Sequence, residues 1–97
     1  MIQELVEIHV IPGHEEAFVA AVAEAKPLFL AAKGCHGLSL HRSVEVQDLY
    51  RLLVQWETVD DHMVGFRNSD GFAEWRRLAG PHFARPPHVE HLEAVIA

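Results

Sequence analysis

The sequence predicts an α+β domain in which helices cover one face of a four-stranded antiparallel sheet. Three observations support this prediction. Four segments alternate apolar and polar residues with the period of a strand, and another places its apolar residues three and four positions apart, as a helix does. Turn and capping residues separate these segments. No repeat or linker interrupts them, so we expect one domain over residues 1–97.

The first half of the chain predicts a strand followed by a long helix. We expect the strand at residues 2–11, with three apolar residues on one face: Val6, Ile8 and Val10. Pro12 and Gly13 then turn the chain into a helix with one apolar stripe: Phe18, Val22, Ala25, Phe29 and Ala32. Pro27 removes a backbone donor, which predicts a bend or an early end, and Gly34 is suited to stop the helix.

The second half predicts two strands, two short helices and a final strand. Residues 36–44 and 49–57 alternate as strands and are joined by a hairpin at 46–48. Thr58 is placed to cap a helix over 59–67, with Asp61 completing a capping box, and Ser69 to cap a second helix that ends at Gly80. The last strand is expected at residues 88–96. This order is that of a ferredoxin-like fold with its second helix split in two.

The helices can cover only one face of such a sheet, and the other face carries Leu5, Leu53 and other apolar residues mixed with polar ones. A second copy of the chain would cover it, sheet on sheet. We therefore expect a homodimer, with Glu7 and His9 near the junction.

Composition excludes several classes of function. The formal charge is -6, and only eight residues are Lys or Arg, which argues against nucleic acid as a partner. No apolar stretch is long enough to span a membrane, and the first residues do not form a basic signal segment, so we expect a cytoplasmic protein. Cys35 is the only cysteine, and we expect a small buried thiol without a catalytic role.

Four stretches carry a resemblance to a known family: residues 12–18, 34–37, 56–62 and 66–76. In order and spacing, the chain resembles the antibiotic biosynthesis monooxygenase family from the first strand to the last. The resemblance implies a dimeric α+β barrel with a pocket between sheet and helices in each subunit. Activities in the family include cofactor-independent oxygenation of polycyclic phenols and quinols, haem degradation and isomerisation of a small metabolite.

The haem-degrading branch uses an Asn on the first strand, a Trp at the end of the short helix and a His ligand to iron. The matching positions here are Val6, Phe66 and Arg76, and a protonated arginine cannot ligate iron, which argues against haem degradation. The quinol-oxidising branch usually has a His near the position of Gly65. The nearest histidine here is His62, one turn earlier.

Cofactor-free oxygenation requires a base, a cation to hold the substrate anion, and an apolar slot. His62 is the candidate base, and the alternative is a solvated histidine in the first turn of a short helix. Arg76 is the candidate cation, and the alternative is a surface arginine paired with Glu74 or Asp70. The candidate substrate-binding residues, which core packing would also explain, are Val6, Trp56, Phe66, Phe72 and Trp75.

The family resemblance, together with these residues, implies a monooxygenase without metal or flavin that acts on a phenol, quinol or polycyclic aromatic. His88, Glu90 and His91 form the densest cluster of metal-ligand types, but on a strand His91 points away from the other two, so no metal site is expected there. A metal at the dimer junction near Glu7 and His9 stays an alternative to charge pairing across the sheet. The alternatives for function are a non-catalytic dimeric domain that binds a small ligand, and an isomerase of a small oxygenated metabolite.

Overall fold

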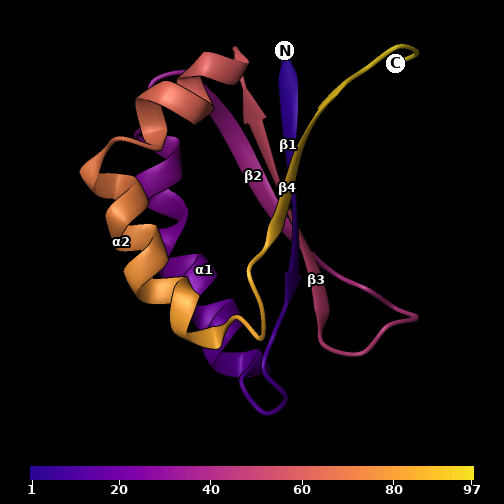
Figure 1. Cartoon of the computed structure of the whole chain (residues 1–97). Coiled ribbons are helices and arrows are strands. Elements are labelled where there is room, and N and C mark those ends of the chain that lie inside the picture. Colours follow the sequence, from indigo (N-terminus) through magenta and orange to yellow (C-terminus); the bar gives the residue numbers. More distant parts are fainter.

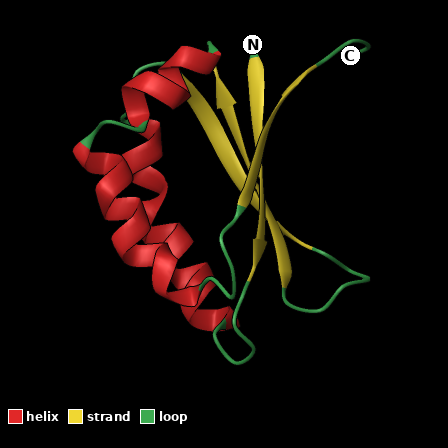
Figure 2. Ribbon diagram, viewed as in Figure 1, coloured by secondary structure: helices red, strands yellow, loops and turns green.

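The computed structural model describes residues 1–97 and confirms a layer of helices on one face of a four-stranded sheet. Figure 1 shows the helices stacked along one side of the sheet, and Figure 2 shows the other side bare of helices. None of the helices has the length and apolar character needed to cross a bilayer. The elements follow in the expected order: β1 (Ile2–His9), α1 (Glu15–Leu30), β2 (Cys35–Arg42), β3 (Leu49–Trp56), the π-helical turn η1 (Asp61–Phe66), α2 (Asp70–Ala79), the 3₁₀ turn η2 (Gly80–His82) and β4 (His88–Glu93).

The strands pair antiparallel in the order β2-β3-β1-β4, which is the ferredoxin-like arrangement. The register places Glu4 of β1 opposite Val54 of β3 and opposite His91 of β4. Residues directly opposite each other in a ladder share a face of the sheet. The two central strands therefore bring Glu4 beneath the helices, together with a histidine from the edge strand.

The core lies between the sheet and the helices, and the alternation in β1 and β3 explains it. From Glu4 onward in β1 and from Tyr50 onward in β3, every second residue is buried, because successive side chains point to opposite faces. Helix α1 adds the predicted stripe, of which Phe18 and Ala25 are fully buried. The largest fully buried side chains are Trp56, Phe18, Ile8, Leu52, Val10 and Val54.

Helix α1 passes through Pro27 and ends at Leu30, so the expected early end at the proline is wrong. A proline costs the helix one hydrogen bond, to the carbonyl four residues earlier. Both Pro27 and Ala23 are exposed, so water can bond to the freed carbonyl. The carbonyl of Pro27 accepts from the amide of Ala31 at 3.0 Å, which shows that regular helical bonding resumes at once.

Gly34 does not stop the helix, which ends earlier; it forms the turn into β2 with a φ of 82°. This left-handed conformation favours glycine. A β-carbon at this position would also collide with the carboxyl of Asp61. Gly34 therefore allows η1 to approach the start of β2 closely.

The two predicted helix starts are confirmed. The amide of Asp61 donates to Thr58 Oγ1 at 3.1 Å, and that of Phe72 donates to Ser69 Oγ at 3.3 Å. The Asp61 carboxylate accepts no hydrogen bond from the amide of Thr58, so the capping box is only half formed. The first of these helices widens into a π turn, in which the amide of Arg67 donates to the carbonyl of His62, five residues earlier, at 3.0 Å.

Two predicted boundaries are wrong. The last strand ends at Glu93 rather than at residue 96, because Glu93 pairs with Ile2, where β1 begins, and no partner strand lies beyond it. The hairpin between β2 and β3 spans residues 43–48 rather than 46–48. It closes with Asp48 at a φ of 62°, a conformation that aspartate tolerates better than most residues.

Candidate functional site

A cavity of about 590 Å³ lies between the sheet and α2, and we call it the α2 cavity. Its floor comes from β1 and β4, one wall from α2 and η1, and its mouth from the loop after η2. The lining is Glu4, Val6, His62, Arg67, Phe72, Trp75, Arg76, Gly80, Phe83, Arg85, Pro86, Pro87 and Val89. The cavity thus combines aromatic and aliphatic walls with one carboxyl, one histidine and three arginines.

Glu4 is the unexpected member of this set. It lies on the face of β1 that carries Val6 and Ile8, and only 4% of its surface is exposed. Its Oε1 accepts from the indole Nε1 of Trp56 at 2.9 Å, and its Oε2 lies 3.3 Å from His62 Nε2. A buried carboxyl held by two side chains is a feature that a stable core would not require.

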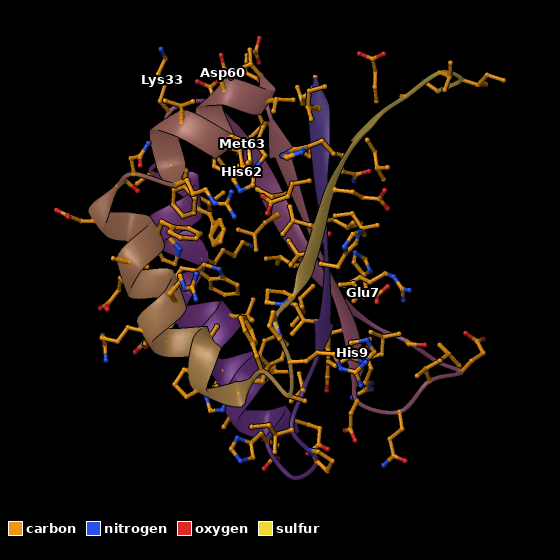
Figure 3. All side chains as sticks on the ribbon, in the orientation of Figure 1. Glu7, His9, Lys33, Asp60, His62 and Met63 are labelled. Atoms are coloured by element: carbon orange, nitrogen blue, oxygen red, sulfur yellow. The ribbon has the colours of Figure 1, made fainter.

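His62 enters the cavity from η1, and Figure 3 shows it on the inner side of that turn, facing the sheet. It is 4% exposed, which excludes the alternative of a solvated histidine. Its ring stacks on Trp56 with centroids 5.4 Å apart and an interplanar angle of 22°. Its Nδ1 lies 2.9 Å from Nε2 of His91 on β4, so both ring nitrogens of His62 are engaged by protein groups.

Burial shifts the two buried groups in opposite directions, because it disfavours the charged form of each. It raises the pKa of Glu4 from 4.5 to about 7, although the Trp56 hydrogen bond and the positive charge of Arg67 partly oppose it. Burial lowers the pKa of His62 from 6.5 to about 4, and the charges of His91 and Arg67 add to this effect. Near neutral pH, His62 is therefore uncharged, while Glu4 exists in both its protonated and its ionised form.

The structure brings five of the seven predicted site residues to this cavity: Val6, His62, Phe72, Trp75 and Arg76. Arg76 is exposed at its mouth, with the guanidinium carbon 5.9 Å from the centre of the Phe72 ring. The expected alternative pairing with Glu74 does not occur, since Glu74 pairs with Arg77.

The other two predicted residues lie behind the cavity wall. Trp56 is fully buried and supports the site through its hydrogen bond to Glu4. Phe66 packs in the core against Phe29, with ring centroids 4.7 Å apart, and against Trp56 at 5.5 Å. Core packing therefore accounts for Phe66.

Sequence reasoning missed several residues of the site, and one of them carried a readable signal. Glu4 continues the apolar face of β1 by a step of two from Val6, so an acidic residue stands where the pattern requires an apolar one. The strand period places His91 on the opposite side of β4 from His88 and Glu90, and the sheet register confirms this, but nothing in the sequence indicates that His91 meets His62. Phe83 and Arg85 reach the cavity from a loop whose course has no periodic signal.

A second, wider hollow of about 770 Å³ lies at the end of α1, between that helix and the η1–α2 junction. Figure 3 shows Lys33 and Asp60 of its lining at the outer end of the molecule. No buried titratable side chain faces it. We therefore place the candidate site in the α2 cavity, where Glu4 and His62 are concentrated.

Other candidate groups are accounted for by local pairing. Glu7 lies 3.2 Å from Arg51 and 3.4 Å from His9, on the sheet face turned away from the helices (Figure 3). This agrees with charge pairing across the sheet, and no group of three or more histidine, cysteine, aspartate or glutamate side chains is arranged to hold a metal ion. Cys35 is half-buried, and burial raises the pKa of its thiol, which disfavours the reactive thiolate.

Comparison with known proteins identifies close relatives. Residues 1–78 match the family model described as antibiotic biosynthesis monooxygenase. An uncharacterised protein of Bacillus subtilis is 37% identical over 95 residues, which are 98% of this chain and 100% of that protein.

Solved structures agree in fold. A crystal structure from Bordetella bronchiseptica, named as a candidate antibiotic biosynthesis monooxygenase, shares 56% identity with a TM-score of 0.96, covering 98% of this chain and 97% of that one. A similarly named structure from Caulobacter crescentus is 23% identical with a TM-score of 0.83, covering 98% of this chain and 90% of that one. The second likeness concerns the fold alone.

Proposed function

Because the chain belongs to the antibiotic biosynthesis monooxygenase family, we propose that it is a cofactor-independent monooxygenase that acts on a phenol or quinol in the α2 cavity. The observation that carries this proposal is Glu4. Its carboxyl is buried in the wall of an aromatic cavity with a pKa of about 7. A base is most effective when its pKa lies near the working pH, and an ordinary glutamate is too weak for this task.

Glu4 takes the first step. In its ionised form, its carboxylate accepts the proton of a substrate hydroxyl, which leaves a phenolate in the cavity. Trp56 Nε1 donates to Oε1 and holds the carboxyl in place. The proton moves only between two oxygen atoms, so this step requires no metal or organic cofactor.

The arginines supply the compensating charge. Arg67, Arg76 and Arg85 all line the cavity, and a guanidinium presents several donors to an oxygen anion. Arg76 lies beside Phe72, so it can face an aromatic substrate stacked on that ring. This placement favours the anion over the neutral phenol and therefore favours the ionisation that Glu4 begins.

The electron-rich phenolate then reacts with dioxygen, and the substrate supplies all the electrons. One oxygen atom is retained in a new carbonyl and the other leaves as water, so a phenol C–H becomes a quinone C=O. Water would intercept the oxygenated intermediate, and the apolar side chains of Val6, Phe72 and Trp75 help to exclude it.

His62 takes a different role from the one expected. Its low pKa makes it a weak general base toward a substrate hydroxyl, and both ring nitrogens already face Glu4 and His91. We therefore assign the role of the base to Glu4. His62 is uncharged and holds the Glu4 carboxyl in position. Its stacking on Trp56 fixes the ring for this purpose.

Oxygen uptake with a panel of hydroquinones and naphthols tests the proposal. Substrates are mixed with the protein without air, and consumption of dioxygen is followed after air is admitted. We expect uptake above the spontaneous rate, with kcat/KM rising through the Glu4 pKa of about 7, because only the ionised carboxylate accepts a proton. Glu4→Gln should lower kcat by about 10²–10⁴-fold, the usual contribution of a general base.

Two variants of neighbouring or similar residues serve as matched controls for Glu4→Gln and Arg76→Ala. Glu93→Gln removes an exposed carboxylate at the end of β4, and Arg77→Ala removes the arginine next to Arg76 that pairs outward with Glu74. Both should behave as wild type, whereas Arg76→Ala should raise KM. Uptake no faster than the spontaneous rate for every aromatic would contradict the oxygenase, and saturable binding without uptake would favour a non-catalytic ligand-binding domain. Turnover without dioxygen would favour an isomerase.

We also propose that two copies pair through the bare face of the sheet. Leu5 of β1 lies opposite Leu53 of β3, and Leu92 of β4 lies on the same face among polar and charged residues such as Glu7 and Arg51. Covering this face would bury these leucines and complete a barrel of two sheets. Sedimentation showing a stable monomer at micromolar concentration would contradict the dimer, and it would leave the chemistry of the α2 cavity unaffected.

A further inference from the structure

We propose that Glu4, His62 and His91 form a proton relay that connects the carboxyl in the α2 cavity with solvent at the edge strand β4. The proposal rests on the assignment of Glu4 as the base and explains how that base exchanges its proton. A base sealed beneath a bound aromatic substrate needs a route for the proton that does not pass through the cavity. The relay provides that route through the wall of the protein.

The geometry of the relay is continuous. Glu4 Oε2 lies 3.3 Å from His62 Nε2, and His62 Nδ1 lies 2.9 Å from His91 Nε2. Three elements hold these side chains, since Glu4 and His91 are cross-strand neighbours on β1 and β4 and His62 reaches them from η1. The exposure of the side chains increases along the relay, from buried Glu4 and His62 to half-buried His91. No protein group bonds the other nitrogen of the His91 ring.

Each histidine can pass a proton because one ring nitrogen receives while the other releases. For outward transfer, Glu4 Oε2 gives its proton to His62 Nε2, and His62 Nδ1 gives its proton to His91 Nε2. His91 Nδ1 then releases a proton to water. Three bonds to hydrogen break and three form, no electrons are transferred, and Glu4 is left ionised; the reverse sequence returns the proton.

The states of the two histidines therefore follow the state of Glu4. When Glu4 is protonated, both rings carry their proton on Nδ1, because His62 Nε2 must accept from the carboxyl. When Glu4 is ionised, both rings carry it on Nε2, because His62 Nε2 must now donate. The low pKa of His62 supports this scheme, since an uncharged ring is required in both states.

Few other charged or titratable groups face the relay. Trp56 of β3, which faces Glu4 and His62, does not titrate. The groups that do carry or change charge come from β2, the end of η1, α2 and the loop before β4: Cys35, Arg67, Arg76 and Arg85. The arginines stay protonated throughout, so the charge that changes near neutral pH inside the cavity is that of Glu4.

Imidazole ¹⁵N spectra of the resting protein test the relay without any substrate. The ¹⁵N shifts report which ring nitrogen carries the proton, and His62→Gln and His91→Gln variants assign the two rings. We expect the proton of both His62 and His91 to move from Nδ1 to Nε2 as pH rises through the Glu4 pKa of about 7. In Glu4→Gln, the shifts of His62 should stay constant, because the amide does not titrate.

Turnover supplies the second test once a substrate is known. His91→Gln keeps a side chain that can bond to His62 but cannot pass a proton on, so its turnover should fall at low buffer concentration. In His91→Ala, imidazole added to the buffer should restore the rate. His88→Gln is the matched control, since His88 is exposed on the same strand and faces the other side of the sheet.

The outcomes separate the relay from the proposed function. A His62 ring that keeps one tautomer, or that stays doubly protonated, across this pH range would overturn the relay. So would a switch that persists in Glu4→Gln. If Glu4→Gln abolishes turnover while His91→Gln and His91→Ala turn over as wild type, the relay is wrong and the base assignment stands. A coupled switch in a protein that oxidises no aromatic would keep the relay and overturn the oxygenase.

Discussion

Replacing Glu4 with glutamine should change the pH dependence of stability in a way that few other substitutions can. The glutamine oxygen still accepts from Trp56 Nε1, so the packing of the site is kept while the titration is removed. The folded protein holds the Glu4 proton more tightly than the unfolded chain does, because its pKa rises from 4.5 to about 7. The stabilisation that results is fully present below the unfolded pKa and is lost as pH rises through the folded one.

The magnitude follows from these two values. Each tenfold change in proton affinity corresponds to about 1.4 kcal/mol, so the Glu4 contribution is about 3 kcal/mol. His62 acts in the opposite sense: its pKa falls from 6.5 to about 4, so its contribution is present above 6.5 and is lost as pH falls through the lower value. Between these limits, the pH dependences of the two contributions nearly offset each other in the wild type, so their sum stays almost constant.

Urea unfolding of wild type and Glu4→Gln at matched protein concentration measures the difference directly. From about pH 4.5 to about pH 8, the free energy of unfolding of wild type should fall by about 3 kcal/mol relative to the variant. The variant alone should become more stable with rising pH, since only the His62 contribution remains. Glu93→Gln is the control for removing an exposed carboxylate.

A constant difference between wild type and Glu4→Gln would refute this reasoning. It would mean that the carboxyl has the same proton affinity in the folded and unfolded states. A difference that grows in favour of wild type as pH rises would mean that Glu4 is stabilised in its ionised form, paired with a protonated His62.

Three further changes test the supports of the site by urea unfolding and pH profiles. Gly34→Ala should lower the free energy of unfolding by clearly more than the roughly 1 kcal/mol that alanine costs in a left-handed conformation, because its β-carbon meets a neighbouring carboxyl. Gly13→Ala, with open space around the β-carbon, should lower the free energy of unfolding by only that amount. Ser69→Ala should lower the free energy of unfolding by about 1 kcal/mol through loss of the helix cap, and an unchanged value would contradict the capping role. Trp56→Phe should raise the pKa of Glu4 further, since the indole donor favours the ionised carboxylate; a kcat/KM profile that does not move to higher pH would contradict this.

The sequence predicts the architecture well because the periodicity of apolar residues and the turn and capping residues act locally. Alternation in β1 and β3 and the stripe of α1 place their residues on the right faces, and Thr58 and Ser69 begin helices as expected. The predicted strand boundaries are wrong where a neighbouring strand determines them. Strand β4 ends at Glu93 because its partner β1 begins at Ile2, opposite Glu93, and no residue of β4 itself signals this.

The site is predicted only in part, for a related reason. Val6, Phe72 and Trp75 follow from element faces, and they line the cavity as expected. The contact between His62 and His91 joins residues from η1 and β4 and depends on the sheet register together with the π turn, neither of which has a local signal. Glu4 could have been identified from the sequence. Burying a carboxyl on an apolar strand face costs free energy, so such a residue indicates that hydrogen bonds stabilise it and that it has a function.

The π turn of η1 has a consequence for how this protein can change during evolution. The turn contains one residue more than an α-helical turn, so a single deletion between residues 63 and 65 would relax it to α-helical geometry with little movement of its ends. His62 lies at the start of the turn and would keep its place beside Glu4, whereas a deletion in an ordinary α-helical turn rotates every later residue by about 100° around the helix axis. This segment can therefore lose one residue while the fold and the position of the histidine are preserved.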